Sequence, residues 1–377
     1  MQLPHDDVDP GGLIEYSVVF TDRSLNHMSA RFAKTMQDLT AVLRRAYGAE
    51  SVAVVPGGGT AAMESVARQL ATNQRCLVIR NGLFSYRWSQ ILEAGRISDD
   101  ITVLQARAES EDPRAAWRPA PIEEVVTVIR ETRPQIVIAP HVETASGIVL
   151  PDEYLRAVSE AVHEVGGLFV LDCIASGALW IDMRASGVDV LLSAPQKGWS
   201  GSPGAGFVML NANARRLVQE SSSSSFTLDL GRWLWIADEY LEGRTPYHST
   251  MPTDSLVHNT NLMAETEQRG FEALRNAQAE LGTRVRSLLA ERGYASVAAS
   301  EFAAPSVVVM HTDDPELQTG ARMKPHGLQI AAGVPLQCGE PSSFSSFRIG
   351  LFGLDKLSDV EGTVSRLMQA FDELEQR

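Results

Sequence analysis

Short apolar runs alternate with segments of helical spacing along the first half of the chain. The runs are too short for typical helices, and the stretches between them repeat apolar residues every three or four positions. The runs are 51–55, 76–79, 101–104, 135–139, 168–171 and 188–192, and the helical stretches include 29–47, 61–71, 84–95, 121–132 and 152–165. Strands that alternate with helices predict an α/β fold with a mostly parallel, doubly wound sheet.

The second half of the chain predicts a smaller unit of mixed structure. Residues 206–210 predict one more strand of the main sheet, and the serine run 221–225 predicts a loop. A long helical stretch, 263–293, is interrupted by Gly270 and Gly282. After it come predicted strands at 306–310, 328–331 and 346–351 and a final helix at 359–374. We therefore expect an N-terminal arm (1–15), a large domain (16–258) and a small C-terminal α/β domain (259–377).

Composition and charge exclude several classes of protein. Hydrophobic residues make up 44% of the 377 residues and charged residues 21%, as in ordinary globular enzymes. The net charge of −14 and the lack of a basic stripe argue against nucleic-acid binding. No apolar run is long enough for a membrane span, and the N-terminus lacks a signal sequence, so we expect a cytoplasmic protein. Three widely separated cysteines predict neither disulfides nor a metal site.

Two polar residues follow apolar runs near the middle of the chain. Asp172 ends the run 168–171, and Lys197 follows the run 188–192 in a loop rich in glycine and serine. Ligands of open parallel sheets bind at the carboxyl ends of strands, where both residues would lie. Pyridoxal phosphate chemistry needs a lysine to form a Schiff base and a carboxylate to keep the ring nitrogen protonated. Alone, each residue has an ordinary structural interpretation, as a helix cap or a surface lysine, but the pairing favours a cofactor site.

A glycine-rich turn, residues 57–60, follows the first predicted strand and opens a helix. Glycines let the backbone approach an anion, and a helix N-terminus offers free N–H groups and the positive end of its dipole. A tight turn without a ligand is the structural alternative, and the turn alone does not decide between them. Its expected place at a strand end, like those of Asp172 and Lys197, favours phosphate binding.

Three further side chains have both a functional and a structural interpretation. Thr144 could donate to a cofactor hydroxyl group or cap a turn, and Phe84 could stack on a planar ring or lie in the core. Arg348 lies in a short apolar strand, where it needs an anionic partner because burying it unpaired is costly. Either a bidentate clamp on a substrate carboxylate or a structural salt bridge would supply that partner.

Together these segments resemble the class V aminotransferases of pyridoxal phosphate fold type I, specifically the alanine–glyoxylate and serine–pyruvate aminotransferase branch. The likeness covers roughly residues 25–375, and its most specific part is the Asp172–Lys197 spacing with Gln196 before the lysine. The other segments that carry it are 57–60, 81–84, 141–147, 171–176, 247–252 and 348–351. The resemblance implies a fold type I enzyme with pyridoxal 5'-phosphate as its cofactor.

The resemblance also implies a role for each matching residue. Lys197 would be the Schiff-base lysine and proton shuttle, Asp172 the partner of the pyridine nitrogen, Phe84 the ring-stacking residue and Thr144 a hydroxyl contact. The residues matching the phosphate cradle are Gly58, Gly59, Thr60 and Gln196.

Two more matches concern the neighbouring subunit and the substrate. Tyr247 and Thr250 match residues that reach the cofactor phosphate of a neighbouring subunit, so the resemblance implies a homodimer. Arg348 matches the clamp on the substrate carboxylate. The expected partners are then a small-molecule amino donor and a 2-oxo acid acceptor.

The implied reaction moves an amino group from a small amino acid, similar to alanine or serine, to a 2-oxo acid such as glyoxylate or pyruvate. Two departures from the family pattern leave the donor open. Residues 14–23 stand where relatives usually have a Pro-Gly-Pro segment that lines the substrate site. Thr60 stands where alanine–glyoxylate enzymes often have His or Trp, and it is shared with the 2-aminoethylphosphonate transaminases. A 2-aminoethylphosphonate or phosphoserine transaminase is therefore an alternative.

A lyase of the same fold, similar to a cysteine desulfurase, is a second alternative. Such enzymes carry a nucleophilic cysteine on a mobile loop, and in this chain Cys338 lies in a loop rich in glycine, proline and serine. Those enzymes typically have His before the lysine, whereas this chain has Gln196. A non-catalytic protein that keeps the fold is disfavoured, because the chain retains the whole set of expected site residues.

Overall fold

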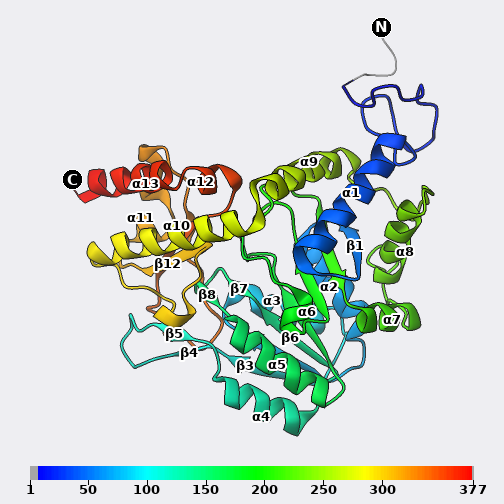
Figure 1. Ribbon diagram of the computed structural model, residues 1–377. Coiled ribbons are helices and arrows are strands. Elements are labelled where there is room, and N and C mark those ends of the chain that lie inside the picture. Colours follow the sequence, from blue (N-terminus) through cyan, green and yellow to red (C-terminus); the bar gives the residue numbers. More distant parts are fainter. Residues whose placement is uncertain (1–6, 376–377) are drawn as a thin grey trace.

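The computed structural model describes residues 7–375, and a seven-stranded sheet lies at its centre (Figure 1). The strand order is β1-β11-β10-β9-β6-β2-β3, and β11 is antiparallel to both neighbours while the other pairs are parallel. The strands are β1 (Ser51–Pro56), β2 (Cys76–Arg80), β3 (Ile101–Gln105), β6 (Ile136–Pro140), β9 (Leu168–Asp172), β10 (Val190–Ser193) and β11 (Ala205–Leu210). The expected α/β fold with a mostly parallel sheet is confirmed.

Helices connect these strands and cover both faces of the sheet. Central strands such as β6 and β11 are buried along their whole length, which requires cover on both faces. The helices of this part are α1 (Ala30–Tyr47), α2 (Gly59–Leu70), α3 (Leu83–Ala94), α4 (Ile122–Thr132), α5 (Asp152–Glu164), α6 (Met183–Ser186), α7 (Ala212–Glu220) and α8 (Leu230–Leu241). The sequence analysis did not predict α7 and α8, but the loop that it predicted at 221–225 lies between them.

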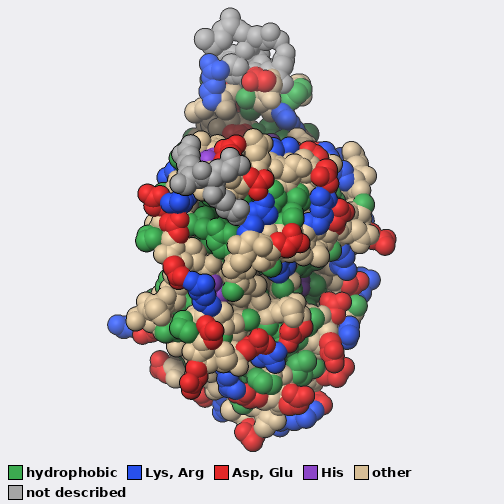
Figure 2. All heavy atoms as spheres, turned by 90° about the vertical axis from the view of Figure 1, so that its left-hand side faces the viewer, with side chains coloured by type: hydrophobic (Ala, Val, Ile, Leu, Met, Phe, Trp, Pro, Cys, Tyr) green, Lys and Arg blue, Asp and Glu red, His purple; other side chains and the backbone are tan. Residues whose placement is uncertain are grey.

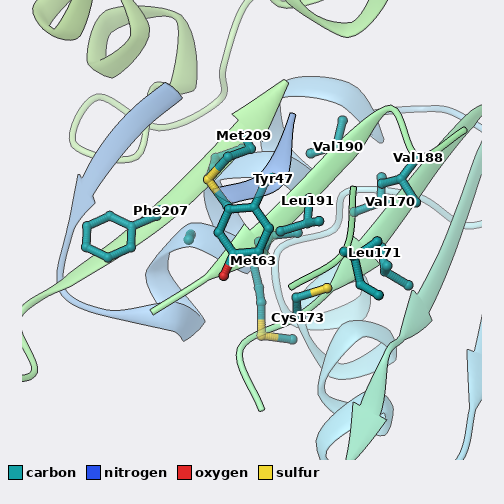
Figure 3. Packing of buried hydrophobic residues seen from close by; sticks show 14 of the residues in the cluster. Tyr47, Met63, Val170, Leu171, Cys173, Val188, Val190, Leu191, Phe207 and Met209 are labelled. Atoms are coloured by element: carbon teal, nitrogen blue, oxygen red, sulfur yellow. The ribbon is translucent and has the colours of Figure 1, made fainter. Parts of the chain in front are cut away.

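The core between the helices and the sheet anchors the loop that carries Lys197. Figure 3 shows the ring of Tyr47, at the end of α1, lying among side chains of the central strands. The Tyr47 hydroxyl donates to Ser193 Oγ over 3.0 Å, and Trp199 Nε1 donates to the same oxygen over 3.3 Å. Ser193 precedes the Lys197 loop and Trp199 follows Lys197. Both ends of the loop are therefore held by hydrogen bonds to the buried hydroxyl of Ser193.

The C-terminal part forms a second, three-stranded antiparallel sheet. Its order is β12-β14-β13, with β12 (Val307–His311), β13 (Ala331–Ala332) and β14 (Ser346–Gly350). The helices of this part are α9 (Thr253–Arg269), α10 (Phe271–Glu291), α11 (Pro315–Gln318), α12 (Leu354–Ser358) and α13 (Val360–Glu375). In Figure 1 this unit lies to one side of the main sheet, with α10 leading into it. The strand predicted at 328–331 is shorter than expected and shifted toward the C-terminus.

One predicted helix break is confirmed and the other is wrong. Gly270 separates α9 from α10, but Gly282 lies within the continuous helix α10. A Cβ at Gly282 would lie 2.4 Å from Cα of Pro305, so this glycine allows close packing and does not interrupt the helix. The predicted domain boundary at 258/259 falls within α9 and stays a prediction, and residues 1–6 of the predicted arm lie outside the described residues.

The surface matches the acidic, mixed composition. On the face drawn in Figure 2, acidic and basic side chains are interspersed. Within residues 7–375, no helix combines the length and the apolar character needed to cross a membrane.

Candidate active site

Five strands of the main sheet end at the same edge, and each end leads into a loop that the sequence analysis singled out. Strand β1 runs parallel to β10 because both are antiparallel to β11, so its end joins those of β2, β6, β9 and β10. The loops are 57–60, 81–85, 141–147, 172–176 and 194–198. The sheet topology thus gathers most of the predicted site residues, as expected for an open parallel sheet.

Phe84 lies at the centre of three cationic side chains. Its ring centroid is 5.8 Å from Lys197 Nζ, 5.4 Å from the guanidinium of Arg348 and 5.4 Å from that of Arg87. Cations at such distances are attracted by the ring quadrupole. The structure therefore brings the predicted residues Phe84, Lys197 and Arg348 together in an electropositive site suited to an anionic ligand.

Lys197 is largely buried, and the groups around it shift its pKa. Burial lowers its pKa, and the cations Arg348 and Arg87 act in the same direction, while Asp172 and Glu143 partly oppose the shift. A second aromatic ring, Phe352, lies 5.7 Å from Lys197 Nζ. A lysine in this state can act as a nucleophile and as a proton acceptor.

Asp172 ends β9, and its carboxylate is buried. Burial raises its pKa to about 6, although the backbone N–H of Ile174, which donates to Oδ1 over 3.0 Å, and the charge of Lys197 both lower it. A cationic N–H donor placed opposite would favour the ionised carboxylate. Such a donor is what the protonated pyridine nitrogen of pyridoxal phosphate would offer.

The turn after β1 has the backbone shape of an anion cradle. Gly57 and Gly58 adopt φ values of 113° and 112°, a conformation that side-chain-bearing residues rarely adopt. Gly58 is the N-cap of α2, and no side chain caps this helix. The first N–H groups of α2 are therefore available to an anion, and the Arg87 guanidinium donates to Thr60 Oγ1 over 3.1 Å beside them. These groups fit the phosphate of pyridoxal phosphate.

The remaining cofactor candidates of this chain lie around the same site. Thr144 is buried, and its carbonyl oxygen accepts from Arg348 Nη1 over 3.3 Å. Gln196 precedes the lysine with an exposed side chain. Both stay predictions as cofactor contacts.

Tyr247 and Thr250 do not join this cluster within one chain. Their hydroxyls hydrogen-bond to each other over 3.1 Å, and the Tyr247 ring packs on His27 at 5.4 Å between centroids. Both residues are exposed. Their predicted contact with a cofactor phosphate would thus have to come from a second subunit.

The sequence analysis missed three residues of the site. Phe352 and Arg87 flank Lys197 and Phe84, and Glu143 is a fully buried carboxylate beside the Phe84 loop. Glu143 lies in the segment 141–147 that carried part of the resemblance, so its position after a buried strand was the available signal. Nothing in the sequence singled out Arg87 or Phe352.

Cys338 lacks the properties of a catalytic nucleophile. Its side chain is buried, and its Sγ lies 3.5 Å from the Arg80 carbonyl oxygen and 3.6 Å from that of Leu336. Burial raises its pKa to about 12, whereas reactive cysteines have lowered pKa values. These features count against the lyase alternative. Among the described residues, no group of three or more His, Cys, Asp and Glu side chains is placed to hold a metal ion.

Comparisons with known proteins agree with this site. No family model matches the chain. A 2-aminoethylphosphonate–pyruvate transaminase of Burkholderia ambifaria is 28% identical over 94% of this chain and 89% of its own length. A Synechococcus protein named the small subunit of a soluble hydrogenase is 25% identical over 93% of this chain and 88% of its own length.

The solved structures give the fold. An alanine–glyoxylate aminotransferase of Nostoc superposes with a TM-score of 0.76 and 24% identity, covering 92% of this chain and 89% of that structure. Its likeness extends over both the main sheet and the C-terminal unit, because so much of each chain is covered. The chain is thus a homologue of the class V aminotransferases and has the fold type I architecture of pyridoxal-phosphate enzymes.

Proposed function

We propose that this aminotransferase transfers the amino group of a small amino acid, similar to alanine or serine, to a 2-oxo acid such as glyoxylate or pyruvate. Pyridoxal phosphate supplies the electron sink for this chemistry when it is bound. The residues that would hold it are the cradle Gly58, Gly59 and Thr60, with Asp172 opposite the ring nitrogen and Phe84 against the ring.

The single observation that carries this proposal is that the guanidinium of Arg348 lies in the site and donates to backbone carbonyl oxygens. Its Nε donates to the carbonyl oxygen of Ala332 over 2.7 Å and its Nη1 to that of Thr144, and no carboxylate within residues 7–375 forms an ion pair with it. Burial lowers its pKa, so the charge is only partly compensated. Because Arg348 faces the same ring as Lys197, the carboxylate of an amino acid bound there would both pair with Arg348 and bring its amine near Lys197.

Lys197 would move the proton in the reaction. Burial lowers its pKa, so Lys197 gives up its proton more readily than an exposed lysine, and the neutral amine can take a proton from the carbon next to the substrate amine. The anchored loop limits its motion, and the aromatic rings of Phe84 and Phe352 flank Nζ. Asp172 would keep the ring nitrogen of the cofactor protonated.

A second donor, 2-aminoethylphosphonate, has specific support. The Burkholderia relative is named for it, and Thr60 and Arg87 form a hydrogen-bonded pair next to the electropositive site. A phosphonate or phosphate group carries more negative charge than a carboxylate and could use both arginines. Phosphoserine belongs to the same class of donor.

A panel of donors tests the function and separates these candidates. We expect purified protein loaded with pyridoxal phosphate to form product from alanine or serine with glyoxylate or pyruvate, measured by chromatography of the amino acids. Arg348→Gln should raise KM for the donor about 10- to 100-fold, the loss of one charge-assisted hydrogen bond. Arg286→Gln is the matched control, because Arg286 also donates to a backbone carbonyl, that of Ala304, but lies on α10.

The outcomes of the panel are distinct. A preference for 2-aminoethylphosphonate or phosphoserine over alanine and serine would select the second candidate. Failure of every donor to react with either oxo acid would refute the proposed function. Equal KM changes in the two arginine variants would show that Arg348 does not bind the substrate carboxylate.

We further propose that the active form is a homodimer, which would cover an exposed apolar surface. Within residues 7–375, the large exposed hydrophobic side chains fall in two segments, 13–28 and 226–247, and include Leu13, Tyr16, Val18 and Phe226. Ring contacts of His27 with Phe20 and with Tyr247 place the two segments side by side. Apolar patches of this kind mark interaction sites, and this one carries Tyr247 and the atypical segment 14–23.

A complementation experiment tests the sharing of residues between subunits. Lys197→Ala and the double variant Tyr247→Phe, Thr250→Ala should each be impaired alone, yet their mixed dimers contain one site with all residues intact. Co-expression should therefore restore about a quarter of the wild-type activity, because about half of the dimers are mixed and one of their two sites is intact. If the mixture shows no gain over the separate variants, Tyr247 and Thr250 do not act across a dimer interface.

A further inference from the structure

We propose that Glu143 is a positioning residue that fixes the loops bearing Phe84 and Thr144 in the cofactor site. This inference rests on the proposed function, since it concerns the same site. It assigns a role to a carboxylate that contacts neither the cradle nor the expected substrate clamp by hydrogen bonds.

The carboxylate of Glu143 is completely buried and accepts four hydrogen bonds. Its Oε1 accepts from the backbone N–H groups of Ala145, over 2.9 Å, and Phe84, over 3.3 Å. Its Oε2 accepts from Ser85, from the backbone N–H over 2.8 Å and from Oγ over 2.7 Å. One side chain therefore joins the loop after β2 to the loop after β6.

An acceptor-only carboxylate suits this arrangement. Each of its two oxygens accepts from at least one backbone N–H group, so a glutamine would have to direct its NH₂ group at an N–H group. The donors include the first N–H groups of α3, whose own N-cap, Gly82, has no side chain to cap it. Gly82 also leaves room for this contact, because a Cβ there would lie 2.6 Å from Cγ of Glu143.

The loops that Glu143 holds carry three groups of the site. Phe84, the ring against which Lys197 and Arg348 lie, donates its N–H to Glu143. Thr144 is the next residue in the chain, and its carbonyl oxygen orients Arg348. Loss of the hydrogen bonds to Glu143 would thus loosen both Phe84 and the loop that orients Arg348.

Glu143 also supplies negative charge close to the cationic groups. Its charge raises the pKa of Lys197 and that of Arg348, against the larger effect of burial. The other charged groups that affect Lys197 are Asp172, Arg87 and Arg348. Removing the charge of Glu143 should therefore lower the pKa of Lys197 further, an effect that a purely structural cap would not produce.

The test compares Glu143→Gln with Asp189→Asn in the apoprotein. Asp189 is a matched control because it is 2% exposed and accepts from Phe169 N–H over 2.8 Å and Asn211 Nδ2 over 2.7 Å. It lies at the beginning of β10, the opposite end of the sheet from the site. The measurements are the Kd of pyridoxal phosphate, from quenching of protein fluorescence, and the rate of cofactor capture as a function of pH.

We expect Glu143→Gln to raise the Kd for pyridoxal phosphate about 10- to 100-fold. The capture rate should reach its plateau at lower pH than in the wild type, since the lysine loses its proton more easily. Asp189→Asn should change the melting temperature but neither of these readouts. Ser85→Ala, which removes one of the four donors, should weaken cofactor binding in the same direction and serves if Glu143→Gln does not fold.

The results separate the inference from the proposed function. Wild-type protein that neither binds pyridoxal phosphate nor transaminates would refute the function. Wild-type protein that does both, with a Glu143→Gln variant unchanged in Kd and capture profile, would refute only the role of Glu143. Equal effects of Glu143→Gln and Asp189→Asn would reduce Glu143 to a stabilising contact.

Discussion

Replacing Lys197 with alanine is expected to lower kcat about 10²- to 10⁴-fold, the range of positioned acid–base catalysis. The variant loses both the amine that would bind the cofactor covalently and the group that would move the substrate proton. The loop should stay in place, because Ser193 and Trp199 anchor it without Lys197. Turnover with the best donor and the visible absorbance of the loaded protein are the measurements.

Two controls make the Lys197 result specific. Lys356→Ala removes another half-buried lysine, which donates to the Phe352 carbonyl oxygen over 3.1 Å, and should leave kcat near the wild-type value. Small primary amines added to Lys197→Ala should restore part of the activity if the missing function is proton transfer. If Lys197→Ala turned over at the wild-type rate, Lys197 would have no catalytic role.

Replacing Asp172 with asparagine is expected to have opposite effects on activity and on the stability of the apoprotein. Asparagine cannot hold a cationic N–H protonated, so kcat should fall by about 10²-fold or more. Its amide keeps an acceptor for the Ile174 N–H, so the turn after β9 should remain. Turnover and thermal unfolding of the cofactor-free protein are the two measurements.

The sign of the stability change follows from the raised pKa of Asp172. Folding raises this pKa from 3.8 to about 6, so the folded apoprotein holds the proton more tightly than the unfolded chain. The associated stabilisation is present below the unfolded pKa and is lost as pH rises through 6, where ionisation is penalised. Asp172→Asn should therefore stabilise the apoprotein at pH 8 by on the order of 3 kcal/mol and leave it unchanged near pH 3. A destabilised variant at pH 8 would contradict this assignment.

The strands of the main sheet could be predicted because each is a short run of apolar residues buried on both faces. The runs 76–79 and 168–171, for example, became β2 and β9 with their starts unchanged. Burial on both faces removes the polar alternation of surface strands, so a continuous apolar run between helical stretches is a strong signal. Helices α7 and α8 were not predicted, and α7 is a short helix that buries only Ala214 and Val218, so its apolar periodicity is weak.

The site could be predicted only where one strand end carries a distinctive residue type. Asp172 and Lys197 were found in this way, and their closeness follows from the neighbouring strands β9 and β10. Phe352 approaches Lys197 from the C-terminal unit, about 150 positions away, and such a contact has no local pattern. Glu143 serves as a cap for a helix that begins far from it in the chain, whereas capping signals in a sequence are local.

The position of β1 in the sheet also affects the order in which the protein can assemble. The cradle at residues 57–60 follows β1, yet the neighbour of β1 is β11, whose register pairs Ser51 with Leu210. A growing chain that has passed Lys197 already contains most of the proposed site residues, but β1 has no strand to pair with until β11 has left the ribosome. The antiparallel strand β11, which contributes no side chain to the proposed chemistry, must therefore be synthesised before β1 can join the sheet, and this non-local pairing is of the kind that slows folding.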